Sequence, residues 1–292
     1  MDYADGYNMD FTNIAIIGVG LMGSSFALAI RKNGYKGKIT GIGRKEENLI
    51  KAKDLGIIDN YSTVHAVGIK DADLIVLACS VGQFEQIAKN IRDSIKSGTI
   101  VTDVGSVKAE IIRKIEPLMP EGVSFVGSHP IAGKECSGLD AGTADLFNNA
   151  KCIITPTSNT NKEALDRVVD IWDRVGSKTI KMSPEEHDLI FAAVSHLPHV
   201  VAYALVNSIM DVDKDILHYG GRGLRDMTRI ALSPTELWRD ICANNRNDIL
   251  RTLRKFSSSL SQMIKFFEDS DWTGLEKEFM RAKEARKLIE SD

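Results

Sequence analysis

The sequence predicts an α/β fold of the Rossmann type, with a doubly wound parallel sheet in an N-terminal domain and an all-helical domain after it. Three observations predict this. A glycine-rich turn joins the first strand to the first helix, strand-like and helix-like segments then alternate, and no strand pattern follows residue 182. The chain of 292 residues is long enough for two domains of roughly 100–200 residues each. We therefore expect the domains to be 1–182 and 183–292.

The first strand and helix enclose a G-x-G-x-x-G motif made of Gly18, Gly20 and Gly23. The first glycine would permit a sharp turn, the second would let the backbone approach a pyrophosphate, and the third would let the helix pack closely on the strand. The anion would then lie at the helix N-terminus, beside Leu21 and Met22. The apolar strand before the motif and the helix after it favour a dinucleotide site over a glycine-rich turn without a ligand.

The second expected strand, residues 38–43, bears on which dinucleotide fits. In NAD-binding versions of this fold, an acid at the end of this strand, roughly 20 residues after the glycines, binds the ribose 2′-hydroxyl. Here the position is Gly43, and Arg44 and Lys45 follow it. Because cations suit a 2′-phosphate, the sequence favours NADP. NAD stays possible if the two cations are only a solvated helix start.

The alternation of strands and helices continues to residue 175 and then gives way to helices. Further strands are expected at 73–79, 99–103, 123–128 and 151–155, with helices at 46–55, 84–95, 109–118 and 162–175. Ser183 and Pro184 have the character of an N-cap and a first helical residue. Helical apolar spacing then recurs over 185–210, 234–244, 246–267 and 272–289. Pro198 should kink the first of these helices.

Polar residues follow the expected strands at the edge where open α/β sheets bind ligands. Ser80 and Asp103 come at two strand ends and are expected to contact the cofactor, and Ser106 lies just beyond. His129 follows the next strand, where a histidine lies near the nicotinamide with a pKa suited to proton transfer. The alternative for His129 is a capping or hydrogen-bonding role.

The helical half contains two further clusters. His196 and His199 could share a metal on one helix, but no third ligand is evident, so no metal site is expected. His187 has no such context and is expected to be a surface or packing residue. Arginines gather between residues 222 and 239, and because guanidinium matches carboxylates, they indicate capture of an anionic substrate. The alternative is a helix with Arg–Asp pairs.

Composition excludes several classes of protein. The formal net charge is −3, with Lys and Arg scattered among acids, so a nucleic-acid partner is not expected. No apolar run approaches the roughly 18 residues of a membrane span, and the acidic N-terminus is unlike a signal peptide. The four cysteines are widely spaced, which is typical of a reducing compartment. We expect a cytoplasmic protein.

Taken together, the motifs resemble the prephenate/arogenate dehydrogenases of tyrosine biosynthesis in order and approximate spacing. The resemblance rests on the glycine motif, Asp103-Val-Gly-Ser106-Val-Lys108, Gly127-Ser-His129-Pro130-Ile-Ala-Gly133, Ser195-His196-Leu-Pro-His199, Gly223-Leu-Arg225-Asp226-Met-Thr-Arg229 and Leu237-Trp238-Arg239-Asp240. It implies oxidative decarboxylation of prephenate to 4-hydroxyphenylpyruvate, or of arogenate to tyrosine, with hydride passing to NAD(P).

The same resemblance implies roles for individual residues. His129 would draw the proton from the ring hydroxyl, and Ser106 would hold that hydroxyl and orient His129. Arg229 would bind a substrate carboxylate and His196 would line the pocket. Further substrate contacts are implied for the following residues: Arg225, Glu135 and Trp238. The tryptophan is similar to one that reaches into the neighbouring subunit's site, which implies a homodimer.

Three matters stay open on the sequence. Prephenate and arogenate differ in a keto or amino group, which one or two contacts could distinguish. Another β-hydroxyacid dehydrogenase, or a dinucleotide sensor without turnover, shares the two-domain plan, although neither gives a reason for His129 beside Ser106. The sequence ends after the last expected helix, so any inhibition by tyrosine is expected to act at the active site rather than through an appended regulatory domain.

Overall fold

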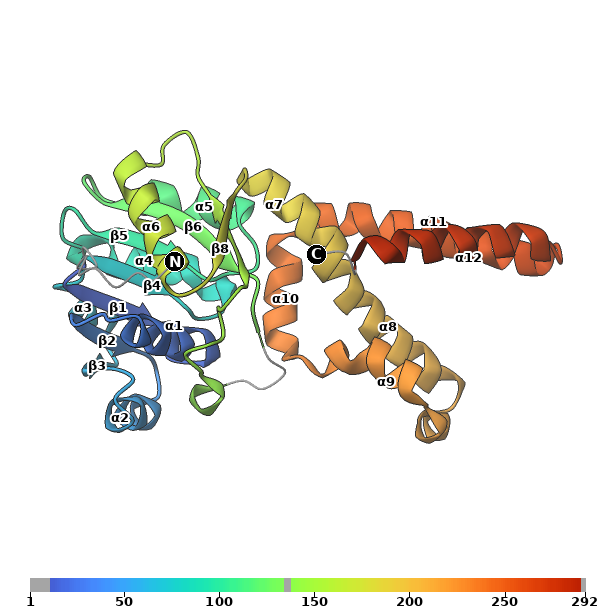
Figure 1. Ribbon diagram of the computed structural model, residues 1–292, viewed down its shortest axis with the longest axis horizontal. Coiled ribbons are helices and arrows are strands. Elements are labelled where there is room, and N and C mark those ends of the chain that lie inside the picture. The colour runs from blue at the N-terminus through green and yellow to red at the C-terminus, as the bar shows by residue number, and fades with distance from the viewer. Residues whose placement is uncertain (1–10, 134–137, 290–292) are drawn as a thin grey trace. The chain divides into compact units, whose positions relative to one another are not determined.

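The computed structural model describes residues 11–133 and 138–289, and the chain divides into two compact units, residues 1–246 and 247–292. An eight-stranded sheet with the order β3-β2-β1-β4-β5-β6-β7-β8 forms the centre of the first unit (Figure 1). The strands are β1 (Asn13–Ile17), β2 (Lys38–Ile42), β3 (Asn60–Ser62), β4 (Leu74–Leu77), β5 (Ile100–Asp103), β6 (Ser124–Pro130), β7 (Lys151–Thr155) and β8 (Lys178–Lys181). The predicted Rossmann-type architecture is confirmed.

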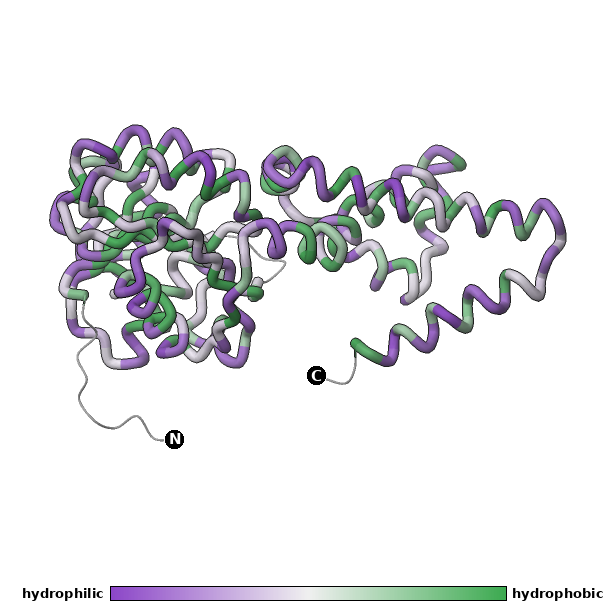
Figure 2. Tube along the Cα trace, turned by 90° about the horizontal axis from the view of Figure 1, so that it is seen from above, coloured by the Kyte–Doolittle hydropathy of each residue, from purple (hydrophilic) through white to green (hydrophobic). Residues whose placement is uncertain are grey.

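Helices cover both faces of this sheet, as a doubly wound fold requires. They are α1 (Leu21–Lys32), α2 (Glu46–Asp54), α3 (His65–Gly68), α4 (Phe84–Ile91), α5 (Ala109–Ile115) and α6 (Lys162–Arg174). Phe26 of α1 and Trp172 of α6 meet in one apolar core, with ring centroids 5.3 Å apart. The other core joins α4 and α5 to the opposite face of the strands. Figure 2 shows the hydrophobic segments concentrated inside this unit.

The sheet differs from the prediction at β6, which lies between β5 and β7. The strand was expected to stop before His129, but β6 continues through His129 and Pro130. The reason is that β7 pairs with β6 in the antiparallel sense, with His129 opposite Ile153 and Pro130 opposite Cys152, while the other strand pairs are parallel. β3, α3 and β8 were not expected, because they are too short to carry a clear apolar period.

The helical part begins as predicted at Ser183, whose side chain accepts a hydrogen bond from the N–H of Glu186 (3.1 Å). The helices that follow in the first unit are α7 (Pro184–Phe191), α8 (Leu197–Val212), α9 (Arg222–Thr228) and α10 (Thr235–Asn244). A π-helical turn, Ala192–His196, separates α7 from α8 just before Pro198. This local distortion replaces the kink that the proline predicts, and such turns are frequent at functional sites.

The compact units divide the chain after Arg246 rather than at the predicted boundary of 182. The cause is α10, because its Trp238 and Ile241 are buried in the same apolar core as Val81 and Phe84. The second unit consists of α11 (Arg246–Glu268) and α12 (Trp272–Arg286), and Asp271 caps α12 by accepting from the N–H of Gly274 (2.8 Å). Hydrophilic and hydrophobic residues alternate along both helices (Figure 2).

Candidate active site

The glycine-rich turn has the backbone geometry that a dinucleotide requires. Gly18 has a φ of +103°, and a Cβ there would lie 2.7 Å from the carbonyl carbon of Ala78. A Cβ on Gly23 would lie 2.1 Å from the carbonyl oxygen of Gly18, so only glycine allows this close packing of α1 on β1. A Cβ on Gly20 would meet nothing within 4 Å. The turn therefore leaves open space where a pyrophosphate approaches.

A groove of about 630 Å³ opens from this turn along the carboxyl ends of β1, β2 and β4. Leu21 and Met22 begin α1 there, and no side chain caps that helix start. The lining residues come from the glycine turn, from the end of β2, from the end of β4 and from α10, and include Gly18, Gly20, Gly43, Arg44, Lys45, Asn48, Ser80, Leu237, Arg239 and Asp240. The residues present fit a bound dinucleotide, since a helix N-terminus and cations both favour its phosphates.

Ser80 joins the end of β4 to α10. Its hydroxyl donates to Oδ2 of Asp240 (2.6 Å), and Nη2 of Arg239 lies 2.8 Å from Oδ1 of the same carboxylate. The hydrogen bond from Ser80 lowers the pKa of Asp240 more than any other interaction of this carboxylate. Ser80 therefore borders the groove as expected and also holds α10 in place as the opposite wall.

Asp103 does not lie where cofactor contact was expected. Its side chain is completely buried, and it forms an ion pair with the equally buried Lys108. It also accepts hydrogen bonds from the backbone N–H of Gly105 (2.9 Å) and of Ser128 (3.0 Å). Burial raises the pKa of Asp103, and the Lys108 ammonium acts against this rise. The carboxylate therefore braces the loop after β5 against β6 instead of facing a ligand.

His129 lies at one end of a buried row of polar side chains. Its Nδ1 lies 2.8 Å from Nε2 of His187, and Nδ1 of His187 lies 2.8 Å from Oδ1 of Asp188. His129 is 9 % exposed, whereas His187 and Asp188 are 0 % and 2 % exposed. The expectation that Ser106 orients His129 is thus corrected, because the hydrogen bond that fixes the imidazole comes from α7. His187, expected at the surface or in simple packing, is part of the site.

The imidazoles in this cluster are held neutral. Burial lowers the pKa of His129 well below its usual value, and the positive charges around it lower it further. Burial also lowers the pKa of His187 to about 2, with Lys108 and His196 as further causes. A neutral imidazole in a dry site can accept a proton, so His129 has the protonation state that a general base needs.

His196 lies close to the same cluster at the end of the π-helical turn. It is 1 % exposed, and its Nδ1 lies 3.1 Å from the side-chain amide of Asn245. Burial lowers its pKa to about 4, whereas the backbone of Ser106 acts in the opposite direction. Its Nε2 is buried and has no hydrogen-bond partner among the described residues. Such a nitrogen is an unused hydrogen-bonding group beside His129.

Trp238 differs from the expectation that it reaches into a neighbouring subunit. The indole is 9 % exposed and packs inside its own chain, where it stacks on His199 with ring centroids 3.6 Å apart. The imidazole of His199 is in turn held by the carbonyl oxygen of Ser195, 2.9 Å from its Nδ1. The stack therefore fixes α10 against α8.

The other predicted substrate-binding residues, Arg229, Arg225 and Glu135, do not lie in the buried histidine cluster as far as the structure describes them. Arg229 is exposed, but its charge reaches His199 and lowers the pKa of that histidine after the larger effect of burial. Arg225 is exposed on α9. Glu135 lies outside the residues that the structure describes. The structure therefore brings His129 and His196 close together, with the backbone of Ser106 beside His196, and Arg229 lies close enough to His199 to lower the pKa of that residue.

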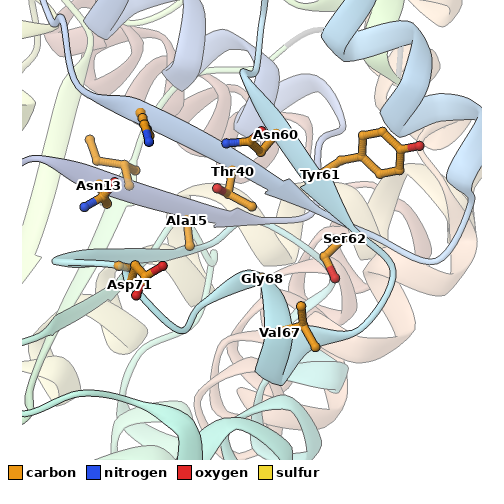
Figure 3. Close-up of a pocket in the computed structure, with 12 residues that line it drawn as sticks. Asn13, Ala15, Thr40, Asn60, Tyr61, Ser62, Val67, Gly68 and Asp71 are labelled. Atoms are coloured by element: carbon orange, nitrogen blue, oxygen red, sulfur yellow. The ribbon is translucent and has the colours of Figure 1, made fainter.

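A second cavity, of about 230 Å³, lies on the β1–β2–β3 side of the sheet (Figure 3). It includes Asn13 and Lys38, which begin β1 and β2, together with Thr40, Tyr61 and Gly68. Asn13 and Lys38 lie at the opposite ends of their strands to the glycine turn. None of the sequence-predicted site residues lines it, so the groove and the histidine cluster together are the candidate site.

Comparison with known proteins identifies the family. Residues 26–181 match the model of the prephenate dehydrogenase nucleotide-binding domain, and residues 183–281 match that of the prephenate dehydrogenase dimerization domain. The chain belongs to the prephenate dehydrogenase family. The boundary between the two matches lies beside residue 182, although the compact units divide elsewhere, and the domain boundary at this position stays a prediction.

Relatives of this prephenate dehydrogenase family member are similar over most of their length. This chain is 34% identical to the prephenate dehydrogenase of Bacillus subtilis, over 94% of this chain and 75% of the Bacillus protein. It is 33% identical to the cyclohexadienyl dehydrogenase of Zymomonas mobilis, over 97% of each chain. A crystal structure of the Aquifex aeolicus prephenate dehydrogenase, in complex with hydroxyphenyl propionate and NAD+, has a TM-score of 0.91 and 37% identity, covering 98% and 99% of the chains.

The row of polar groups behind His129 had little signal in the sequence of this family member. His187 and Asp188 are 58 and 59 positions away from His129 and belong to a helix with an unremarkable apolar pattern. One feature could have indicated burial: His187 is four residues before Phe191, so both occupy one helix face. The ring of Phe191 indeed lies 4.5 Å from that of His187 and 4.9 Å from that of His129.

Proposed function

We propose that this chain is a prephenate dehydrogenase of tyrosine biosynthesis, which converts prephenate to 4-hydroxyphenylpyruvate and carbon dioxide. The observation that supports this most directly is a buried, neutral His129 at the carboxyl edge of the sheet that also carries the dinucleotide groove. Arogenate is the alternative substrate, since the Zymomonas relative is named for cyclohexadienyl substrates in general. The family match supports both.

The site residues divide the chemistry between a proton acceptor and a set of anchors. The bound dinucleotide supplies the hydride acceptor. Nε2 of His129 accepts the proton of the ring hydroxyl as the hydride leaves the ring carbon that bears this hydroxyl. Loss of carbon dioxide then makes the ring aromatic. Ser106 is proposed to hold the hydroxyl and His196 to line the pocket around the ring, which is supported by His196 beside His129 and by the backbone of Ser106 beside His196.

Arg229 is proposed to bind a substrate carboxylate, so replacing it with alanine should raise KM. Loss of a hydrogen bond to a charged group costs roughly 1.5–3 kcal/mol, which corresponds to an increase in KM of about 10- to 100-fold with a smaller change in kcat. Steady-state kinetics with saturating dinucleotide measure this. Arg92→Ala, at an exposed arginine that does not line the groove, is the control and should leave KM unchanged. An unaltered KM in Arg229→Ala would remove this residue from the carboxylate site.

NADP is proposed as the favoured dinucleotide, with NAD as the alternative. The described residues that line the groove at the end of β2 are Gly43, Arg44, Lys45, Asn48 and Leu49, and none of these is acidic. An acid at this position would hydrogen-bond the ribose 2′-hydroxyl of NAD, whereas cations match the 2′-phosphate of NADP. The Aquifex structure contains NAD+, which makes the cofactor the first property to measure.

The proposed function is tested by steady-state reduction of NAD and of NADP, each with prephenate and with arogenate. We expect turnover with prephenate, and a higher kcat/KM with NADP than with NAD. Turnover with arogenate alone would show that arogenate, and not prephenate, is the substrate. A preference for NAD would overturn the cofactor proposal. If neither substrate is turned over while the dinucleotide still binds, another β-hydroxyacid dehydrogenase or a non-catalytic sensor becomes the better interpretation.

A homodimer is proposed for the helical part. Contrary to the expectation that no apolar run approaches a membrane span, the helical stretch from Pro184 to Val212 is 29 residues long and by length and composition could cross a membrane. Only 22% of its most apolar segment is buried within the chain, so most of this apolar surface is left uncovered. Val194, Met210 and Val212 are among its exposed apolar side chains. The match to a dimerization domain over residues 183–281 supports a second copy of the chain as the cover for this surface, in a cytoplasmic enzyme.

A further inference from the structure

We propose that His187 and Asp188 act as a positioning pair that fixes the tautomer of His129, so that Nε2 of His129 is the proton acceptor in the reaction. This inference rests on the proposed function and adds two positioning residues to it. Both belong to α7, whereas His129 belongs to β6. In this row of hydrogen bonds, the group that accepts at Asp188 determines which nitrogen of each imidazole carries the proton.

Asp188 is an acceptor on both oxygens. Its Oδ1 accepts from the backbone N–H of Lys108 (2.8 Å), and its Oδ2 accepts from the N–H of Ala109 (2.9 Å). These two N–H groups lie at the start of α5, where the helix dipole also favours a negative charge. A second hydrogen bond fixes the segment, since Nδ2 of Asn245 donates to the carbonyl oxygen of Asp188 (2.8 Å). Burial raises the pKa of Asp188, and the hydrogen bonds from the two backbone N–H groups act against this rise. In its ionised form the carboxylate is held by these bonds and accepts from His187.

The direction of the remaining hydrogen bonds follows from this. Because Asp188 accepts, Nδ1 of His187 carries the proton across the 2.8 Å contact. His187 is neutral, so its Nε2 has a free lone pair and must accept from Nδ1–H of His129 (2.8 Å). His129, also neutral, then has no proton on Nε2. Without this pair, imidazole would distribute its proton between the two nitrogens, and only one of the tautomers could act as a base.

The surroundings keep this order of protons stable. Phe191 packs against both imidazoles, with centroids 4.9 Å from His129 and 4.5 Å from His187. The charged and titratable groups that face the pair are Lys108 and Asp103 from the loop after β5, His196 from the π-helical turn, and Cys152 of β7, which pairs with the β6 edge. Lys108 is neutralised by Asp103. Burial is the main cause that disfavours a resting imidazolium at His129, which leaves this residue ready to accept a proton.

During turnover the pair also stabilises the protonated form of His129. The proton of the substrate hydroxyl binds to Nε2, the hydride passes to the dinucleotide, and the resulting imidazolium keeps its Nδ1–H on Nε2 of His187. The carboxylate of Asp188 lies at the far end of the row and supplies the balancing negative charge through His187. After the product leaves, Nε2 of His129 releases the proton to solvent. The pair touches neither substrate nor cofactor, so it acts only through His129.

The test compares His187→Leu with His187→Gln. Leucine removes the acceptor for Nδ1–H of His129, whereas the side-chain oxygen of glutamine can accept in its place. We expect kcat to fall by about 100-fold or more in His187→Leu, with KM and the dinucleotide Kd changed little, and to recover to within about 10-fold of the parent enzyme in His187→Gln. His218→Leu, at an exposed histidine, is the control for a histidine change elsewhere and should retain full activity.

The pH profile separates positioning from packing. His187→Leu removes the acceptor for Nδ1–H of His129 together with one of the groups that lower the pKa of this residue, so the pKa of His129 changes and the acid limb of kcat/KM moves. In His187→Gln the limb should stay close to that of the parent enzyme. Equal losses of kcat in both variants, with an unmoved acid limb, would show that His187 serves only as packing and would overturn the proposal.

A measurement without turnover distinguishes this inference from the proposed function. ¹⁵N NMR of the histidine-labelled parent enzyme should show His129 with an unprotonated Nε2 and a protonated Nδ1, and His187→Leu should show a mixture of tautomers. If the parent enzyme shows this tautomer but turns over no prephenate or arogenate, the function fails and the positioning pair stands. If His129 carries its proton on Nε2, the positioning pair fails whatever the substrate.

Discussion

Replacing His129 with asparagine should abolish turnover and leave dinucleotide binding intact. Asparagine is of similar size and polar, but it cannot take up a proton. General-base catalysis contributes roughly 100- to 10,000-fold, and we expect kcat to fall by about 1,000-fold or more. The fold should tolerate the change, because the backbone of residue 129 is paired with Ile153 in the sheet and the glycine turn is built separately. Formation of the reduced nicotinamide and the dinucleotide Kd are the two measurements.

His218→Asn is the matched control for this experiment, since it makes the same exchange at an exposed histidine and should leave both quantities unchanged. The prediction fails if His129→Asn retains a substantial part of the parent kcat, because another group would then be the proton acceptor. A loss of dinucleotide binding in His129→Asn, with the control intact, would show instead that the substitution disturbs the groove and not only the chemical step.

Replacing Lys108 with methionine should strongly destabilise the fold. The ammonium of Lys108 is fully buried, pairs with the fully buried Asp103 and donates to the carbonyl oxygen of Ser128 (2.9 Å). Removing one partner of a buried ion pair leaves an uncompensated charge and costs about 3–5 kcal/mol. Methionine fills a similar volume, so the expected loss comes from the charge and not from a cavity. Urea unfolding of the parent and the variant measures the difference in the free energy of unfolding.

The pH dependence of this loss identifies its cause. Without Lys108, burial raises the pKa of Asp103 in the folded variant above that in the unfolded chain, and only the backbone N–H groups of Gly105 and Ser128 still act against this rise. The penalty is therefore fully present above the folded-state pKa and shrinks as the pH falls through it, because a protonated carboxyl carries no charge. Lys89→Met, which breaks an exposed ion pair with Glu85, is the control and should change stability little. A loss for Lys108→Met that is independent of pH would attribute the effect to packing.

The positions of the glycine turn and of His129 were predictable because their signals are local. Three glycines with fixed spacing, a preceding apolar strand and a following helix all lie within one short segment, and the structure has the turn at Gly18 and the close contact at Gly23 that this spacing requires. His129 directly follows an apolar strand pattern, so its place at the sheet edge also follows from the residues next to it. Local pattern likewise predicted the N-cap at Ser183.

Other assignments needed the folded chain. Asp103 at a strand end has the same local pattern whether it faces a ligand or a buried lysine, and only the position of Lys108 beside it and of Ser128 on β6 decides between the two. Trp238 was expected at a neighbouring subunit from resemblance, but the stack with His199 buries it in its own chain. Likewise, nothing in the residues of β6 and β7 indicates that these two strands pair in the antiparallel sense.

The sequence by itself therefore determined the fold class, the glycine-rich turn and the position of His129 at the end of a strand, since each depends on residues that are neighbours along the chain. The tertiary structure alone decided how that histidine is oriented. The hydrogen bond between His129 and His187 joins β6 to α7 across 58 positions of sequence. Asp188, which is bonded to His187, is in turn held by the start of α5. Contacts between such distant segments leave no period or spacing in the sequence, because they arise only when packing brings the segments together.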